Sequence, residues 1–180
     1  MSGSCVDGEL DLVAHSYGGL VAILAAGLAP KRIRSLTLFE PAAYSLARGR
    51  PGVEALIERM TPVVDQAPLL GAVEYQNLFL TALTGSLPGP LNGSDILAAE
   101  RDRLLLAPWV FELPEDVLSA VPTLVVTGDW NEEYEEIAEA MEKAGARHAQ
   151  LVGYGHRVQD HPGANALIAA SVSGSGSGHG

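Results

Sequence analysis

Short apolar segments recur along the chain, and they indicate the strands of a sheet. Leu10–His15, Ile33–Phe39 and Thr123–Thr127 are rich in leucine and valine, and turn or helix signals bound each of them. Segments with this character are typical of parallel strands that are covered on both faces. Residues 147–152 form a weaker fourth candidate, because their polar side chains favour a position nearer the sheet edge. The pattern therefore predicts three buried strands and a fourth at the margin.

The segments between and after these strands have the apolar spacing that is typical of helices. Residues 18–29 are apolar almost all round and stop at Pro30, as expected of a buried helix. Residues 131–144 predict an amphipathic helix, with Asn131 at its N-cap and acidic side chains in its first turn. A last helix is expected at residues 162–172, because proline favours the first helical position. Strands that alternate with helices predict an α/β fold, in which a parallel sheet carries helices on both faces.

The region between the second and third strands follows a different pattern. Helical patches cover residues 52–64, 70–83 and 94–106, and a stretch rich in glycine and proline interrupts them at 85–93. No strand of comparable quality occurs there, so we interpret the region as an inserted helical cap. The predicted divisions are a core of residues 1–41 and 119–172, a cap of residues 42–118, and a flexible Ser/Gly-rich tail of residues 173–180.

Composition and charge narrow the classes of function. The 180 residues fit one domain with a sizeable core, and 47% hydrophobic against 18% charged residues is ordinary for a soluble globular protein. The net charge of −11 disfavours a nucleic acid or an anionic membrane as a partner. Cys5 has no second cysteine to pair with, and no secretory signal is evident at the N-terminus. We therefore expect a cytoplasmic protein without a nucleic-acid or membrane partner.

Residues 14–19 contain the first chemical signal. The order Ala-His-Ser-Tyr-Gly-Gly places Ser16 between a predicted strand and a predicted helix. A sharp strand-to-helix turn that presents a hydroxyl needs small residues two positions before and after the nucleophile, and Ala14 and Gly18 meet this need. The positive end of the helix faces the turn, so the backbone N–H of Tyr17 is a natural donor to an oxyanion. Ser16 is the candidate nucleophile.

Two further candidates follow later strands. Asp129 lies just beyond Thr123–Thr127, where a carboxylate can reach a histidine on a neighbouring loop. The alternative interpretation of Asp129 is a helix N-terminal residue, since a helix follows at once. His156 follows the fourth strand, in the sequence Gly-Tyr-Gly-His. The chain order Ser, Asp, His is that of one class of serine hydrolases, and it differs from the order in proteases built on other folds.

Other polar residues near these positions have competing interpretations. Asp160 is the second candidate for the acid, although it also suits a helix cap. Glu40 ends a strand near the expected cleft and is a candidate for lining the pocket. His15 is assigned packing or hydrogen bonding rather than proton transfer, and His161 a structural role at a helix entry. No pair of histidines or cysteines has metal-ligand spacing, and no phosphate loop or dinucleotide fingerprint occurs, so neither a metal nor a cofactor is expected.

Together these features resemble the α/β-hydrolase fold family. The likeness covers the turn at 14–19, the strand exit Ser-Leu-Thr-Leu-Phe-Glu-Pro at 35–41, the cap, Gly128-Asp129 and Gly155-His156. The resemblance implies that Ser16 is the nucleophile, His156 the general base and then acid, and Asp129 the residue that orients the imidazole. It also implies a cap-bearing serine hydrolase that needs no cofactor and cleaves a small-molecule ester or related acyl substrate.

The departure from this family lies before the nucleophile. Its members usually place several strands there, together with a loop that donates the second oxyanion N–H. Here Leu10–His15 is expected at a sheet edge, although it is as apolar as a central strand. We therefore expect the C-terminal half of an α/β-hydrolase sheet, and either a homo-oligomer or a chain that supplies the missing strands. The competing function is a catalytically silent or weak half-hydrolase that serves as a binding or assembly module.

Overall fold

Parallel strands form one sheet in the computed structural model, which describes residues 8–174. The strands are β1 (Leu10–His15), β2 (Ile33–Phe39), β3 (Thr123–Thr127) and β4 (Arg147–Gln150), and they lie in that order across the sheet. Each strand pairs with the next in parallel. The first three match the predicted bounds. The fourth ends before residue 152, because the chain enters a turn at residues 152–153.

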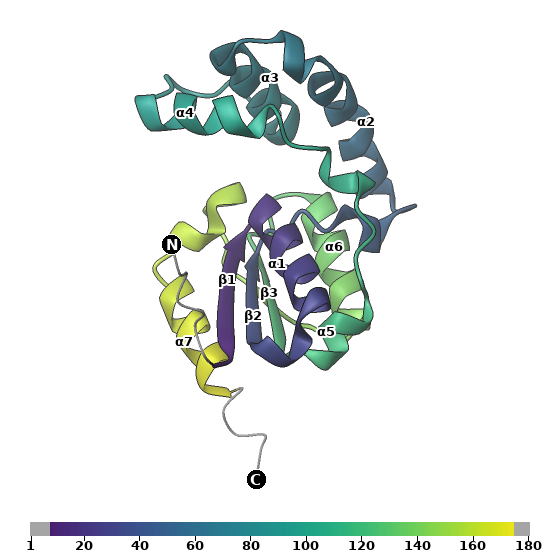
Figure 1. Cartoon of the computed structure of the whole chain (residues 1–180). Coiled ribbons are helices and arrows are strands. Elements are labelled where there is room, and N and C mark those ends of the chain that lie inside the picture. Colours follow the sequence, from purple (N-terminus) through teal and green to yellow (C-terminus); the bar gives the residue numbers. More distant parts are fainter. Residues whose placement is uncertain (1–7, 175–180) are drawn as a thin grey trace, which may run out of the picture.

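Helices connect the strands and cover both faces of the sheet, with α7 on one side and α1, α5 and α6 on the other (Figure 1). The helices are α1 (Tyr17–Leu28), α2 (Pro51–Gln66), α3 (Ala72–Thr84), α4 (Gly93–Asp102), α5 (Asp116–Ala120), α6 (Glu132–Lys143) and α7 (Ala164–Gly174). Short 3-10 turns occur at Pro30–Arg32, Tyr44–Ala47, Ala67–Leu69, Pro108–Val110 and Gly155–Asp160. The predicted α/β fold with helices on both faces is confirmed.

The helix ends follow local chemistry. The Oδ1 atom of Asn131 accepts the backbone N–H of Tyr134 at 3.3 Å, so the predicted N-cap of α6 is in place. Helix α7 begins at Ala164 rather than at residue 162, and the N–H of Gly163 donates instead to Nδ1 of His161 at 2.9 Å. The predicted tail begins inside this helix, which ends at Gly174. The rest of the tail, residues 175–180, lies outside the described residues.

The core has two parts because side chains alternate across the strands. Leu36 and Leu38 of β2 and Val125 of β3 point into the cluster under α1 and α6. Phe39 of β2 and Val126 of β3 point to the opposite face, into the cluster under α7. These strand residues have relative exposures of 0–1%. Burial on both faces explains why leucine, valine and phenylalanine occur at neighbouring positions in β2 and β3 rather than alternating with exposed polar residues.

Helices α2, α3 and α4, which we call the helical insert, lie beyond the carboxyl ends of the strands (Figure 1). A small cluster of their own, which includes Tyr75 and Ala99, holds α3 and α4 together. Helix α2 rests on α6: the N–H of Val53 donates to Glu136 at 2.8 Å, and Arg59 pairs with Glu133 at 3.1 Å. Helix α4 ends before the predicted residue 106, at Asp102. The insert is therefore fixed to the element that follows β3.

Strand β1 forms one edge of the sheet, as the sequence predicts. Its neighbour α1 has no charged residue and exposes Val21 and Leu28 at 51% and 90%. Val13 of β1 is 48% exposed on the opposite face of the sheet, because Leu12 and Ala14, its neighbours in the strand, pack against the cluster under α1. The described part of the chain thus has an apolar flank along an open strand edge. None of the helices within residues 8–174 has the length and hydropathy needed to cross a lipid bilayer.

Candidate active site

Ser16 occupies a tight turn between β1 and α1. Its backbone lies in the left-handed region with φ of 52°, which is costly for a residue with a side chain. The turn is held because the N–H of Ser16 donates to the Phe39 carbonyl at 2.9 Å, while its own carbonyl accepts the N–H of Ala42 at 3.0 Å. A Cβ at Gly19 would lie 2.7 Å from Pro41, so only glycine fits there. The sequence prediction of a strand, sharp turn and helix is confirmed.

His156 stands against this serine. Its Nε2 atom lies 3.1 Å from Ser16 Oγ, which is hydrogen-bond distance. The residue belongs to the 3-10 turn Gly155–Asp160, which follows β4, so two distant parts of the chain meet at this point. The rings of Trp130 and Tyr134 pack on the imidazole, with centroids at 6.2 and 5.1 Å. The structure brings together the two residues predicted as nucleophile and base.

The carboxylate beside His156 is that of Glu40. Its Oε2 atom lies 3.7 Å from His156 Nδ1, and the side chain is fully buried. The backbone N–H of Gly128 donates to Oε1 at 2.7 Å, and Trp130 Nε1 donates to Oε2 at 3.0 Å. Two such donors stabilise a buried carboxylate, because an unpaired charge without hydrogen bonds is expensive to bury. The ring nitrogen Nδ1 has no hydrogen-bond partner of its own among the described residues, so Glu40 is the group it faces.

Asp129, the predicted acid, is placed elsewhere. It directly follows Gly128 at the end of β3, but its backbone has φ of 51° and its side chain is exposed. Its N–H donates to Glu135 at 3.1 Å, and within residues 8–174 no hydrogen bond or ion pair joins it to His156. Asp160, the second candidate, pairs with Arg157 at 2.6 Å. The geometry therefore corrects the assignment of the acid: the N–H of Asp129 faces Glu135, its side chain is exposed, and the carboxylate beside the base is that of Glu40.

Sequence reasoning named Glu40 only as a candidate for lining the pocket. One signal favoured a larger role: Glu40 directly follows Ile33–Phe39, which the pattern predicts as a buried strand. Its φ of 43° turns the side chain back under the sheet end, and no sequence pattern states this direction. Asp129 and Glu40 both follow buried strands and both have positive φ, and they differ in burial and in the groups that they contact.

Tyr17 begins α1, so its backbone N–H belongs to the first turn, where helical N–H groups have no intrahelical acceptor. This placement agrees with the predicted oxyanion donor. The Tyr17 hydroxyl donates to the Leu106 carbonyl at 3.2 Å, and the ring meets the edge of Phe111 at 6.5 Å. Trp109 contacts the ring of Tyr44 at 6.2 Å. The segment that follows the helical insert therefore passes directly over the turn of Ser16.

Two buried tyrosines lie near the base, and the ring of one of them, Tyr134, packs on His156. The hydroxyls of Tyr44 and Tyr134 lie 3.2 Å apart within the core. Burial raises the pKa of both hydroxyls above the usual range. They therefore stay protonated and neutral, and they add no charge next to His156.

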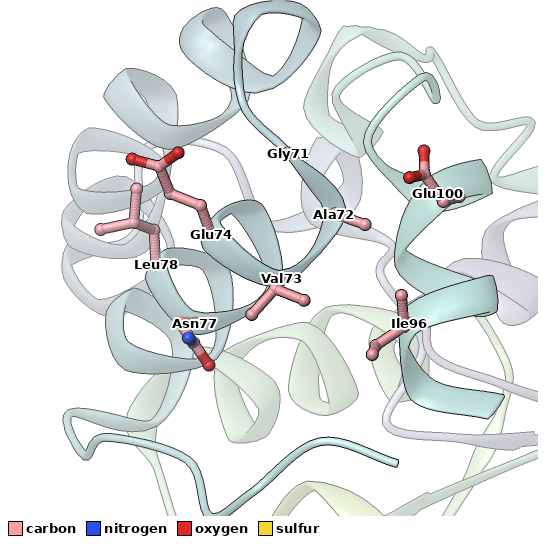
Figure 2. A pocket seen from close by; sticks show the side chains of 8 residues that line it. All are labelled: Gly71, Ala72, Val73, Glu74, Asn77, Leu78, Ile96 and Glu100. Atoms are coloured by element: carbon pink, nitrogen blue, oxygen red, sulfur yellow. The ribbon is translucent and has the colours of Figure 1, made fainter. Parts of the chain in front are cut away.

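A hollow of about 620 Å³ lies far from this chemistry, between α3 and α4 (Figure 2). Its lining contains the apolar side chains of Val73, Leu78 and Ile96, with Glu74 and Glu100 at its margins. None of these side chains is a nucleophile paired with a base. The hollow is a surface feature of the helical insert and not the site that contains Ser16.

Comparison with known proteins places the chain in a family. The model of the alpha/beta hydrolase family matches residues 3–166. The probable lysophospholipase BODYGUARD 1 of Arabidopsis thaliana is 41% identical over 51 residues, which make up 28% of this chain and 11% of that protein. Among solved structures, the carboxylesterase CesB of Bacillus subtilis is 14% identical with a TM-score of 0.60, and the match covers 92% of this chain and 60% of that one.

A hydrolase from Oleispira antarctica is also 14% identical, with a TM-score of 0.62, and the match covers 91% of this chain and 65% of that one. At this level of identity, the two solved structures demonstrate a shared fold. The chain spans less than two thirds of the length of either of them. Because the family model matches residues 3–166, which are most of the sequence, the chain belongs to the alpha/beta hydrolase family.

Proposed function

We propose that the chain is a serine hydrolase that cleaves an ester or a related acyl bond through Ser16, His156 and Glu40. The observation that carries the proposal is the 3.1 Å approach of Ser16 Oγ to His156 Nε2 at the apex of a strained turn. A hydroxyl is a weak nucleophile until a base accepts its proton, and neutral imidazole at this distance is such a base. Membership of a hydrolase family supports the same conclusion.

The chemistry proceeds in two stages. Ser16 Oγ attacks the carbonyl carbon of the substrate while His156 Nε2 accepts the hydroxyl proton, and the carbonyl oxygen becomes an oxyanion. The tetrahedral intermediate collapses as His156 returns the proton to the leaving alcohol, which leaves an acyl group on Ser16. Water then attacks this acyl-enzyme with His156 as base, and the carboxylic acid departs. The free N–H of Tyr17 supports the oxyanion in both stages.

In this mechanism Glu40, and not Asp129, is the carboxylate that orients the imidazole of His156. When His156 takes the serine proton it becomes a cation, and a carboxylate beside Nδ1 stabilises that cation and keeps the ring in one tautomer. The 3.7 Å separation is longer than a hydrogen bond, and this is common in the absence of substrate. The two N–H donors to Glu40 fix the orientation of its carboxyl group beside His156.

A fluorophosphonate probe and a chromogenic ester test the proposal together. We expect the probe to label Ser16 in the full chain, and p-nitrophenyl butyrate to be hydrolysed at a rate that the Ser16→Ala variant loses. The matched control is Ser45→Ala, which removes a hydroxyl from a serine outside the site. Labelling at another residue, or hydrolysis that persists in Ser16→Ala, would contradict the proposed mechanism.

The second candidate function is a binding or assembly module that has the hydrolase fold without turnover. The open edge of β1 favours it, because a strand edge is a surface onto which another chain can add. The same assay distinguishes the two functions. A folded chain whose Ser16 resists the probe supports the module.

A further inference from the structure

His15 lies directly against the proposed base. Its imidazole ends β1, and Nε2 is 2.8 Å from the main-chain carbonyl oxygen of His156. The two rings are 4.6 Å apart at their centroids and inclined by 51°. A carbonyl can only accept, so Nε2 of His15 carries the proton and donates it. We infer that His15 is a positioning residue, which holds the His156 loop at the correct distance from Ser16; this inference rests on the proposed function.

The loop that carries His156 needs such a contact. Gly153 and Gly155, which precede the base, have positive φ values of 104° and 52°, so a turn joins β4 to the short 3-10 segment that contains His156. The last strand bond before it joins the N–H of Leu151 to Thr127. The hydrogen bond from His15 ties the loop to β1, the strand that also delivers Ser16. One short segment of chain thus places the nucleophile and secures the base.

Charge supports a positioning role over proton transfer. Burial lowers the pKa of His15 to about 4, and the charges of His156 and Arg157 act in the same direction, against the hydrogen bond to His156 and the charge of Asp160. His15 therefore stays neutral at the pH where a histidine base works. A second cation stacked on His156 would oppose the imidazolium that forms during catalysis. A neutral donor supplies the contact without that cost.

Two substitutions separate the hydrogen bond from simple packing. His15→Gln keeps an N–H at the same number of bonds from the backbone as Nε2, whereas His15→Phe keeps the ring and removes the donor. We expect His15→Phe to lower kcat on p-nitrophenyl butyrate about 10-fold or more with KM nearly unchanged, because small displacements of catalytic groups are costly. His15→Gln should stay within about 3-fold of the native kcat. An unchanged kcat in the phenylalanine variant, or an equal loss in both, would overturn the inference.

Nuclear magnetic resonance of the native chain provides a readout that needs no turnover. With ¹⁵N-labelled histidine, we expect His15 to remain the neutral Nε2–H tautomer from pH 7 down to about 5. The Nδ1 proton of His156, which faces Glu40, should be visible in the native chain and in His15→Gln, and should be lost through solvent exchange in His15→Phe. If the phenylalanine variant does not fold, His15→Asn replaces it, because its amide is one bond too short to reach.

These measurements test the proposed function and the positioning role of His15 separately. If Ser16 is inert but His15 shows the Nε2–H tautomer and controls the His156 proton, the proposed function fails and the positioning contact stands. If His15 is found as the Nδ1–H tautomer, or titrates near pH 6.5, the positioning role is wrong whatever the activity.

Discussion

Glu40 and Asp129 differ in what their carboxylates touch, and this difference can be measured. Replacing Glu40 by Gln removes the negative charge beside His156 while an acceptor remains for one of the two N–H donors. We expect Glu40→Gln to lower kcat on p-nitrophenyl butyrate by about 10²- to 10⁴-fold, because the imidazolium loses its counter-charge.

The matched control for this substitution is Asp129→Asn, since Asp129 is exposed and makes no contact with the base. We expect native turnover from it, with thermal unfolding recorded for both variants. The reverse order, with the large loss in Asp129→Asn, would restore the acid that the sequence predicts.

The sequence predicts Ser16 from local order, a strand, a turn of small residues and a helix, and it predicts His156 from the chain order Ser, Asp, His. The structure places these two side chains 3.1 Å apart. The carboxylate that pairs with the base could not be identified from the sequence in this way. Glu40 and Asp129 both follow buried strands, and the choice between them depends on how two backbones with positive φ direct their side chains. For His15 the sequence predicts packing or hydrogen bonding but not the partner, since that partner is a main-chain carbonyl 141 positions away.

His15 also makes stability depend on pH. Its pKa is about 4 in the folded chain against 6.5 in an unfolded one, so the unfolded state binds more protons between these values. The free energy of unfolding should therefore fall as the pH drops from about 6.5 to 4, by about 3 kcal/mol from this residue, and should recover fully above 6.5.

Urea unfolding of the native chain and of His15→Phe at pH 7 and 4.5 isolates this contribution, because the carboxylates titrate alike in both. The native chain should lose more stability on acidification than the variant. Equal losses would show that burial does not depress the pKa of His15.

At the level of whole elements, the contact between α2 and α6 determines how firmly the helical insert is seated. Glu136 is 8% exposed and accepts the N–H of Val53 in the first turn of α2, so it caps that helix from a neighbouring one. We expect Glu136→Ala to lower the free energy of unfolding by about 1–2 kcal/mol, because a buried N–H is left without a partner.

Glu139 lies on the same helix and pairs with Arg50 at the surface. Glu139→Ala is the matched control, and we expect it to leave the free energy of unfolding nearly unchanged in the same urea titration. A larger loss in the control would mean that surface pairs, and not the buried cap, seat the insert.

The elements themselves were largely predictable. Strands β1 to β3 and helices α1 and α6 carry continuous apolar runs or a clear amphipathic face with caps, and these signals are local. The short helix α5 and the 3-10 turns carry no such signal, because their few residues are shaped by the packing around them. The end of α4 was placed too late, since the exposed residues Leu104 to Leu106 continue the apolar pattern after the helix has stopped.

For the molecule as a whole, the open edge of β1 beside an uncharged helix predicts association. We expect light scattering to detect self-association that increases with concentration, or capture of a chain that adds strands to this edge. A charge on the edge should reduce it, so Val13→Lys should shift the chain toward monomer.

Val73→Lys is the control, because Val73 has nearly the same exposure, 46% against 48%, but lies in the helical insert (Figure 2). A monomer at every concentration, or an equal effect of both lysines, would contradict association through β1.

The three described residues other than glycine that have positive φ are Ser16, Glu40 and Asp129, and they sit at the ends of three adjacent strands. Two of them belong to the proposed catalytic group, so the conformational cost at those positions cannot be relieved by glycine without losing the reaction. Asp129 has no proposed role in catalysis. Asp129→Gly should therefore raise the melting temperature while turnover is unchanged. Of the three strained positions at the sheet end, this is the one where a substitution can increase thermal stability without a loss of activity.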